Sequence, residues 1–131
     1  MSTRQDKSLH DACAKGHLRK VREMLQTDMD VTYKLEQRIG FLGYTPLHEA
    51  ACQGRDDILQ LLLIYGGNVD AMANGNYTPL HIAASMDYVK CIKVLIKYGA
   101  NIKALDDFNK TPYQTAVQHK RKASAKCLKS A

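Results

Sequence analysis

Apolar residues recur at helical spacing in two stretches of the chain that lie 33 residues apart, counted from position 58 to position 91. In both stretches they occupy positions i, i+1, i+4 and i+5, which fall on one face of an α-helix. The pattern predicts helices near 56–65 and 89–98. Their apolar positions are Ile58, Leu59, Leu62 and Leu63 in the first helix and Cys91, Ile92, Leu95 and Ile96 in the second.

Turn-forming residues follow each of these predicted helices. Gly66 and Gly99 stand directly after the helices, where a glycine commonly ends a helix in the left-handed conformation. Gly43, Asn76 and Asn109 each stand two residues before a threonine, and all three are residue types that tolerate positive φ. We therefore expect a hairpin-like turn before each of these threonines.

A short motif predicts a second, shorter helix in each unit. It reads Thr-Pro-Leu-His-Glu-Ala-Ala at 45–51 and Thr-Pro-Leu-His-Ile-Ala-Ala at 78–84, with a degraded copy at 111–116 and a fainter one at 7–12. Its threonine is a good helix cap, and its proline suits the first helical position. The copies are displaced by 33 residues, or by 38 for the first pair. Such a period indicates stacked units that cannot bury their apolar faces alone.

The motif Thr-Pro-Leu-His-x-Ala at a period of 33 residues resembles the signature of ankyrin-repeat proteins. The resemblance implies an all-α solenoid of helix-turn-helix units joined by β-hairpin-like loops. Aligned on the motif, the repeats span about 7–44, 45–77, 78–110 and 111–131. We expect residues 7–131 to form a single ankyrin-repeat domain, preceded by a flexible N-terminus at 1–6.

The two terminal repeats differ from the middle ones at helix positions that are apolar elsewhere. Lys20 and Glu23 replace apolar residues in the first repeat, and Lys122 and Lys129 do so in the last. Terminal repeats of a stack need a polar outer face. We therefore expect both to act as caps of a self-contained array.

The first repeat carries five more residues than the others, as its displacement of 38 rather than 33 requires. The extra length falls in the segment 32–44, which contains several apolar residues. Insertions in repeat proteins map to loops on one face, often the binding face. The segment is therefore predicted to be a long loop that contributes to specificity.

Charge is distributed unevenly along the 131-residue chain, whose formal net charge is +6. Residues 45–89 hold one basic and five acidic residues, so 1 − 5 = −4, and the remainder holds 18 basic and 8 acidic residues, so +10. The basic residues are densest at 120–122. They indicate either a surface for nucleic acid or anionic lipid at the C-terminal end, or simply charged caps. We favour caps, because no aromatic residues are interleaved with the lysines.

Cysteines and the N-terminus bear on the compartment. Cys13, Cys52, Cys91 and Cys127 lack metal-type spacing, and we expect Cys91 and Cys127 to be small core residues in a reducing environment. Cys52 falls on a position predicted to be exposed, so it should label most readily. The N-terminus is polar, and no apolar run approaches the ~18 residues of a membrane span. An intracellular protein, in cytoplasm or nucleus, is expected.

The histidines and carboxylates do not assemble a reactive site. His10, His48 and His81 share the motif position in successive repeats, about 8–10 Å apart, which is too far to share one metal ion. The resemblance implies a structural role, in which the ring bonds the motif threonine and the backbone of the next loop. His17 and His119 are expected on the surface. We predict no enzyme activity, no cofactor and no metal.

The resemblance also implies a non-catalytic protein-protein interaction module, either an adaptor or scaffold or a regulatory binding domain. Its partner would be another protein or a peptide segment rather than nucleic acid, held by the hairpin tips, the 32–44 loop and the exposed side of the first helices. We expect a monomer, with a homodimer through the same surface as the alternative. The first repeat offers Ala14 and Lys15. The other predicted partner-binding residues are Phe41, Leu42, Tyr44, Cys52, Gln53, Met72, Asn74, Tyr77, Ser85, Met86, Leu105, Asp107, Phe108, Lys110, Gln118 and His119.

Overall fold

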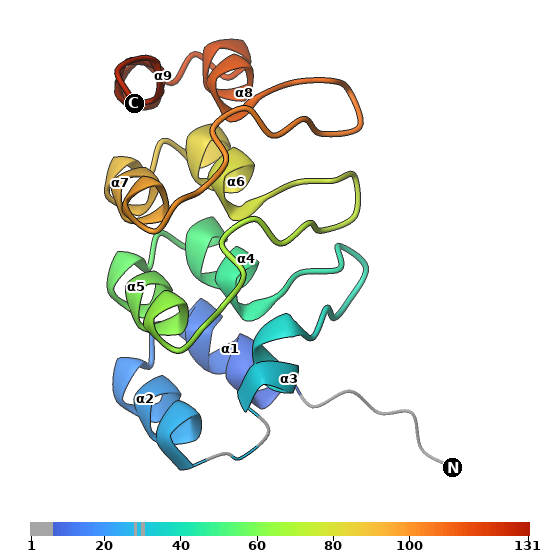
Figure 1. The fold of residues 1–131 in the computed structure, drawn as a ribbon, viewed down its shortest axis with the longest axis vertical. Coiled ribbons are helices and arrows are strands. Elements are labelled where there is room, and N and C mark those ends of the chain that lie inside the picture. Colours follow the sequence, from blue (N-terminus) through green and yellow to red (C-terminus); the bar gives the residue numbers. More distant parts are fainter. Residues whose placement is uncertain (1–6, 28, 30) are drawn as a thin grey trace.

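The structure, a computed structural model, describes residues 7–27, 29 and 31–131. The segment 1–6, for which the sequence predicted flexibility, lies outside the described residues. Across the described part of the chain there are nine helices and no strand, which confirms the predicted all-α solenoid. Figure 1 shows the helices stacked in pairs in chain order, with long loops projecting from one side of the stack.

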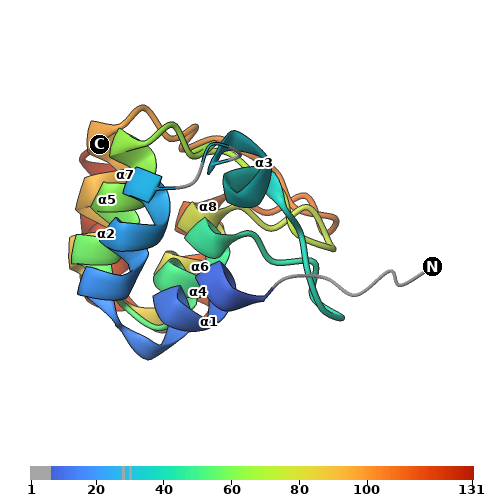
Figure 2. The same ribbon diagram turned by 90° about the horizontal axis from the view of Figure 1, so that it is seen from below.

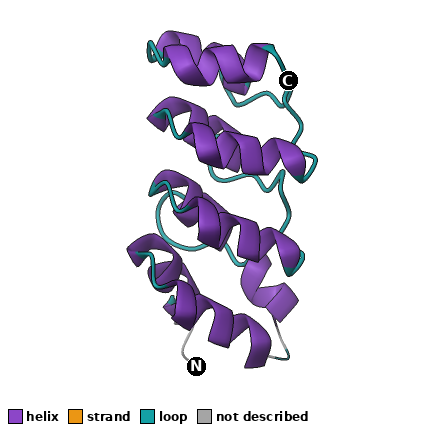
Figure 3. Ribbon diagram, turned by 90° about the vertical axis from the view of Figure 1, so that its left-hand side faces the viewer, coloured by secondary structure: helices purple, strands orange, loops and turns teal. Residues whose placement is uncertain are grey.

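Two rows of helices run along the stack. The inner row lies beside the loops and the outer row lies on the far side, as the view along the stack in Figure 2 shows. The outer row faces the viewer in Figure 3. The inner row consists of α1 (Ser8–Lys15), α4 (Pro46–Cys52), α6 (Pro79–Met86) and α8 (Pro112–Gln118), and the outer row of α2 (Leu18–Thr27), α5 (Asp56–Ile64), α7 (Val89–Lys97) and α9 (Lys122–Lys129).

The motif threonines cap the inner helices as predicted. Thr45, Thr78 and Thr111 have extended backbone, and each hydroxyl accepts a hydrogen bond from the backbone N–H three residues on. The side chain at that third position in turn accepts a bond from the N–H of the threonine. Two otherwise unpaired backbone donors are satisfied at each helix start, which fixes where the helix begins.

The predicted left-handed positions are confirmed. Gly66 and Gly99 have φ of +99° and +88° just after the outer helices. The turn residues Gly43, Asn76 and Asn109 have φ of +67°, +61° and +58°. Because each of these residue types tolerates positive φ, the loops turn back toward the next inner helix without backbone strain.

The core lies between the two rows and between successive repeats. The apolar faces predicted for the outer helices are buried except for the half-buried Ile96, and α5 and α7 end within one residue of their predicted ends. Paired alanines of the motif are fully buried on the inner helices, where their small size allows neighbouring helices to approach closely. The largest fully buried apolar side chains include Leu47, Ile58, Leu59, Leu62, Leu80, Ile92 and Leu95.

The extra segment of the first repeat is not simply a loop, and this corrects the prediction for 32–44. Its first part forms a short helix, α3 (Val31–Glu36), which packs against α4. Val31 and Leu35 are four residues apart and so share one face of the helix. Leu35 is 3% exposed and Ile39 is 8% exposed. The insertion therefore contributes Leu35 to the core through α3, and only its second half projects as a loop.

Two cysteines differ from prediction. Cys127 is half-buried rather than buried, because its position lies at the edge of the buried face, where Leu61 and Val94 are half-buried too. Cys52 is half-buried rather than exposed. Burial, and then the nearby Glu49 carboxylate, raise the pKa of the Cys52 thiol, so its reactive thiolate form is disfavoured. Ready labelling of Cys52 is no longer expected.

Candidate partner-binding groove

Three loops form parallel projections on the inner side, here called finger 1 (37–44), finger 2 (67–77) and finger 3 (100–110) (Figure 1). Each is closed by backbone hydrogen bonds near its tip. In finger 1, Ile39 and Tyr44 exchange N–H···O bonds of 3.0 and 3.2 Å. In finger 2 the Ala73 N–H donates to the Tyr77 carbonyl at 2.8 Å. The fingers are therefore hairpin-like in shape.

Fingers 1 and 2 are tied together by Asn74. Its backbone N–H donates to the Leu42 carbonyl at 3.0 Å, and its side-chain amide donates to the Phe41 carbonyl at 2.8 Å. The Arg38 guanidinium donates to its Oδ1 at 2.6 Å. Asn74 was predicted as a partner contact, but in this structure its side chain is engaged in holding finger 1 beside finger 2.

Fingers 2 and 3 are tied in a related way. The backbone N–H of Asp107 donates to the Gly75 carbonyl at 2.9 Å, and its carboxylate accepts from the Asn76 side chain at 2.8 Å. Asp107 was also predicted as a partner contact. Because polar groups at the same place in successive repeats bond finger to finger, the three fingers form one continuous wall.

The motif histidines fix this wall to the inner helices. The Nδ1 of His48 lies 2.8 Å from the Thr45 hydroxyl and accepts the Thr45 N–H, while Nε2 lies 2.8 Å from the Tyr77 carbonyl. His81 repeats the arrangement with Thr78 and the Lys110 carbonyl. These contacts require a neutral ring that accepts at Nδ1 and donates at Nε2. The structural role that the resemblance implied is confirmed for both residues.

Burial sets the protonation of these rings. His48 is fully buried, and burial lowers its pKa from 6.5 to about 4, although the bond to the Tyr77 carbonyl opposes the shift. Burial also lowers the pKa of His81. His10, in the first repeat, places Nε2 2.8 Å from the Gln37 carbonyl and 3.0 Å from the Tyr44 carbonyl. All three histidines thus join an inner helix to the base of a finger.

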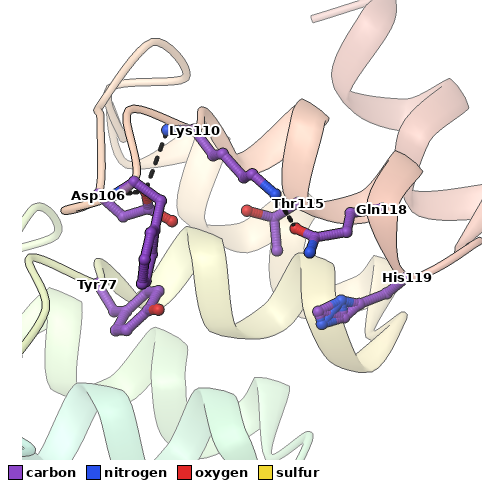
Figure 4. A pocket seen from close by; sticks show the side chains of 7 residues that line it. Tyr77, Asp106, Lys110, Thr115, Gln118 and His119 are labelled. Atoms are coloured by element: carbon purple, nitrogen blue, oxygen red, sulfur yellow. Dashed lines mark hydrogen bonds between the residues drawn. The ribbon is translucent and has the colours of Figure 1, made fainter.

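A groove lies between the fingers and the inner helices. It comprises two adjoining hollows of about 240 and 220 Å³, which share Tyr77, Thr115 and His119. In Figure 4 Tyr77 and His119 lie at opposite sides of the larger hollow, with Lys110 reaching across it toward Gln118. The remaining lining residues are Asp106, Phe108, Lys110 and Gln118 in the larger hollow, and Tyr44, His81, Ile82 and Ser85 in the smaller.

Polar groups in the larger hollow are largely satisfied within the protein. Asp106 is buried, and its Oδ1 accepts the N–H groups of Phe108 at 2.8 Å and Lys110 at 3.0 Å. The Lys110 ammonium donates to the Gln118 side chain. These bonds shape finger 3 and leave the aromatic rings of Tyr77 and Phe108 as the main apolar surface of the hollow.

The two groove tyrosines each contact the motif histidine of the following repeat. The rings of Tyr44 and His48 stack with centroids 5.3 Å apart, and those of Tyr77 and His81 meet edge to face at 6.2 Å. The Tyr77 ring also covers Gly75, where an added Cβ would come within 2.6 Å of it. The tyrosines are therefore half-buried members of the wall as well as lining residues of the groove.

The sixteen predicted contact residues fall into several settings. Seven line the two hollows, and two bond finger to finger. Phe41, Leu42, Met72 and Leu105 are exposed on the fingers, with Phe41 at 95%. The other three lie near the ends of inner helices, where Cys52 is half-buried and Gln53 and Met86 are exposed. The hollow-lining residues are Tyr44, Tyr77, Ser85, Phe108, Lys110, Gln118 and His119.

Sequence reasoning missed the floor of the groove. Ile82 and Thr115 are each 7% exposed and line it. Both follow the motif histidine position directly, as Glu49 does one repeat earlier. This is the variable position x of the motif Thr-Pro-Leu-His-x-Ala, and its variability was the signal in the sequence that could have located the groove floor. The first two repeats have Asp11 and Glu49 at this position, so the row of equivalent residues becomes acidic toward the first repeat. Burial, and then the carboxylate of Asp11, raise the pKa of Glu49.

Two further observations concern the kind of site. Within 7–27, 29 and 31–131, no three histidine, cysteine or carboxylate side chains are grouped so that they could hold a metal ion. None of the helices there combines the length and the apolar character needed to cross a membrane.

A family model described as ankyrin repeats (3 copies) matches residues 2–73 and, in a second match, residues 63–131. Together the two matches cover all but the first residue.

Proposed function

The chain belongs to the ankyrin-repeat family, and from this premise we propose that it holds a segment of a partner protein in the groove and against the fingers. Ankyrin repeats are generally protein-protein interaction modules and are typically non-catalytic. The surface that the resemblance implied comprises the hairpin tips, the 32–44 loop and the exposed side of the first helices. The proposal narrows it to the groove and the three fingers, from finger 1 to the fourth repeat.

Exposed apolar side chains around the groove carry the proposal. Phe108 lines the larger hollow and is 72% exposed, and Phe41, Met72 and Leu105 project from the same wall. Contacts within the fold account for much of the burial of Tyr44 and Tyr77, but they leave Phe108 largely uncovered. Exposed aromatic side chains beside a concave surface are typical anchors of protein partners.

The size of the hollows indicates the class of ligand. Each has about 220–240 Å³, which is below the roughly 300–1,000 Å³ typical of small-molecule pockets. Each hollow suits one or two side chains of a polypeptide. Because the hollows adjoin along the stack, a partner segment running parallel to the stack could fill both.

A peptide selected by display on the full chain provides the probe for a test. Phe108→Ala should weaken its binding at least tenfold while leaving the melting temperature unchanged, because the ring is mostly exposed. Tyr77→Ala is less clean, since that ring also covers Gly75 and meets His81.

Val117→Ala is the matched control. Val117 is also an exposed apolar residue, but its equivalents Ala51 and Ala84 are buried between repeats, so it faces the C-terminal end of the stack. Its replacement should not affect peptide binding. Equal loss in both variants, or selected peptides indifferent to Phe108→Ala, would refute the groove assignment. A wild-type dimer in light scattering that Phe108→Ala dissociates would instead identify a second copy as the occupant.

Arg121, in the basic run at 120–122, has a role within the stack. Its guanidinium Nε donates to the Ser85 carbonyl at 2.9 Å, joining the last repeat to the third. Arg55 makes the equivalent contact to the Ala14 carbonyl at 3.4 Å. Part of the run is therefore explained by a contact that holds the stack together.

A further inference from the structure

Exposed basic residues cluster on the side of the stack opposite the groove. Three positions in or directly after each outer helix recur with the repeat period and lie outside the buried faces. They belong to the outer row, which faces the viewer in Figure 3. We call these twelve residues the outer face. They are Arg19, Arg22, Gln26, Asp57, Gln60, Ile64, Lys90, Lys93, Lys97, Ala123, Lys126 and Ser130, all exposed except the half-buried Gln60.

The outer face has six basic residues and one acidic residue, so its net charge is 6 − 1 = +5, against +6 for the whole chain. None of the six basic side chains forms a hydrogen bond or ion pair with another residue of the described chain. The Lys97 ammonium lies 5.9 Å from the centroid of the Tyr98 ring, which leaves it open to solvent. These charges are therefore available to a partner.

Two parts of the arrangement work against helix stability, although Lys97 and Lys126 lie in last turns, where the helix dipole favours basic residues. Lys90 and Lys93 are three residues apart and Lys97 is four further on, so like charges are neighbours on one helix face. The first turns of α2, α7 and α9 have no acidic residue, whereas α5 begins with Asp56 and Asp57. Acidic residues are favoured at helix N-termini by the helix dipole. Stability alone would not select this pattern.

Capping of the stack does not explain the outer face either. The need for a polar end accounts for Lys122 and Lys129, which replace half-buried or buried apolar positions of the middle repeats. Lys90, Lys93 and Lys97 belong to an internal repeat. At the same positions the second repeat has an aspartate, a glutamine and an isoleucine, which shows that the fold does not require lysine there.

We propose that the outer face docks on an anionic phospholipid surface. This goes beyond the proposed partner binding and uses different residues. Clusters of lysine and arginine near a membrane are attracted to its anionic lipids. The outer helices present their charges over a nearly straight side of the stack in Figure 1, which suits a planar anion array. Ile64, near the middle of the face, is 59% exposed and could contact the lipid interface.

Other polyanions fit this face less well. Aromatic side chains that stack on bases are typical of single-strand binding, and none of the twelve outer-face residues is aromatic. Four of the six basic residues are lysines, which act as hydrated point charges, whereas arginine is preferred for bidentate recognition of individual phosphates. A diffuse contact with a charged layer matches these side chains best.

Co-sedimentation of the full chain with lipid vesicles tests the proposal. Vesicles of phosphatidylcholine mixed with phosphatidylserine should bind the chain, pure phosphatidylcholine should not, and added salt should weaken the binding. The variant Lys90→Gln, Lys93→Gln, Lys97→Gln should bind about a hundredfold more weakly, because each lysine near an anionic surface contributes about fivefold. Phe108→Ala should bind the vesicles as the wild type does.

The matched control removes three lysines elsewhere, with Lys7→Gln, Lys15→Gln and Lys103→Gln. It has the same net charge as the outer-face variant but an intact outer face, so it should retain most vesicle binding. Equal loss in the two variants, or no preference for phosphatidylserine, would overturn the proposal. So would tighter binding of duplex DNA or of poly-glutamate at the same salt, since the occupant would then be a different polyanion.

Discussion

The two long sides of the stack differ in whether their polar side chains bond within the fold or remain in solvent. On the inner side, Asn74, Asp106 and Asp107 bond to the backbone or side chains of the fingers, and what remains for a partner is mainly aromatic. On the outer face, Lys90 and Lys93 make no such bonds and remain in solvent. The inner side is suited to recognition by shape, and the outer face to recognition by charge.

This difference follows from what each side connects. The inner side must join loops from successive repeats, so its polar side chains form the hydrogen bonds that hold those loops together. The outer helices pack through their apolar faces, and their outward positions have no structural task. Those positions are therefore free to vary from the acidic start of α5 to the lysines of α7.

Acid should lower the folding stability through the buried histidines of the inner side, and this is the largest effect that we expect. The pKa of His48 is about 4 in the fold and 6.5 when unfolded, so between these pH values the unfolded chain binds more protons. Stability should therefore fall as the pH drops from 6.5 to 4, by on the order of 3 kcal/mol from His48. His81 acts in the same direction, and the raised pKa of Glu49 partly opposes both.

Thermal unfolding of the wild type and of His48→Gln across this pH range provides the measurement. Gln114 already occupies the histidine position in the last repeat, where its Oε1 accepts the Thr111 N–H at 2.9 Å. The His48→Gln variant should be less stable near neutral pH, because the bond to the Tyr77 carbonyl is lost, but its stability should change less with pH. If the stability of His48→Gln depended on pH as strongly as that of the wild type, His48 would not titrate as its burial requires.

Sequence alone was sufficient wherever a residue type has a single local function. Thr45 and Thr78 cap helices, and Asn76 and Asn109 accept positive φ, because capping and turn chemistry depend on neighbouring backbone. The repeat period then placed the loops and the buried faces. It even located most of the groove-lining residues, since those recur one repeat apart.

The rest depended on contacts between distant residues. The period could not show that Asn74 bonds to finger 1, because the partner groups are backbone carbonyls 32 and 33 residues away. The insertion breaks the period, so α3 had no template, although the spacing of Val31 and Leu35 was a usable signal. The outer face was overlooked because its charges are spread over four helices rather than adjacent in sequence.

Loosening one finger should show whether the fingers open independently of the core or only together with it. Asn74→Ala removes the side-chain bonds to the Phe41 carbonyl and to Arg38 but keeps the backbone bond to Leu42. Because these groups are exposed, the cost should be about 1 kcal/mol or less. Amide hydrogen exchange should quicken in finger 1 and stay unchanged in finger 3.

Gln60→Ala, on the outer face, is the control for Asn74→Ala, because its side chain makes no hydrogen bond with the described residues. It should change neither finger. If Asn74→Ala quickened exchange throughout the stack, the fingers would be part of the cooperative core rather than a wall attached to it.

The smallest expected effect tests whether the lysines of α7 lower the stability of the helix that carries them. Lys90→Asp gives α7 the acidic first turn that Asp57 gives α5 and removes the repulsion with Lys93. Both changes favour the helix, so denaturant unfolding at low salt should show a gain of about 0.5 kcal/mol, reduced at high salt. Binding to phosphatidylserine vesicles should weaken at the same time. Lys103→Asp, in finger 3, has the same charge change outside any helix and should produce neither result. If Lys90→Asp destabilised the chain, Lys90 would have a structural role, and the contrast between the two sides would not hold at this position.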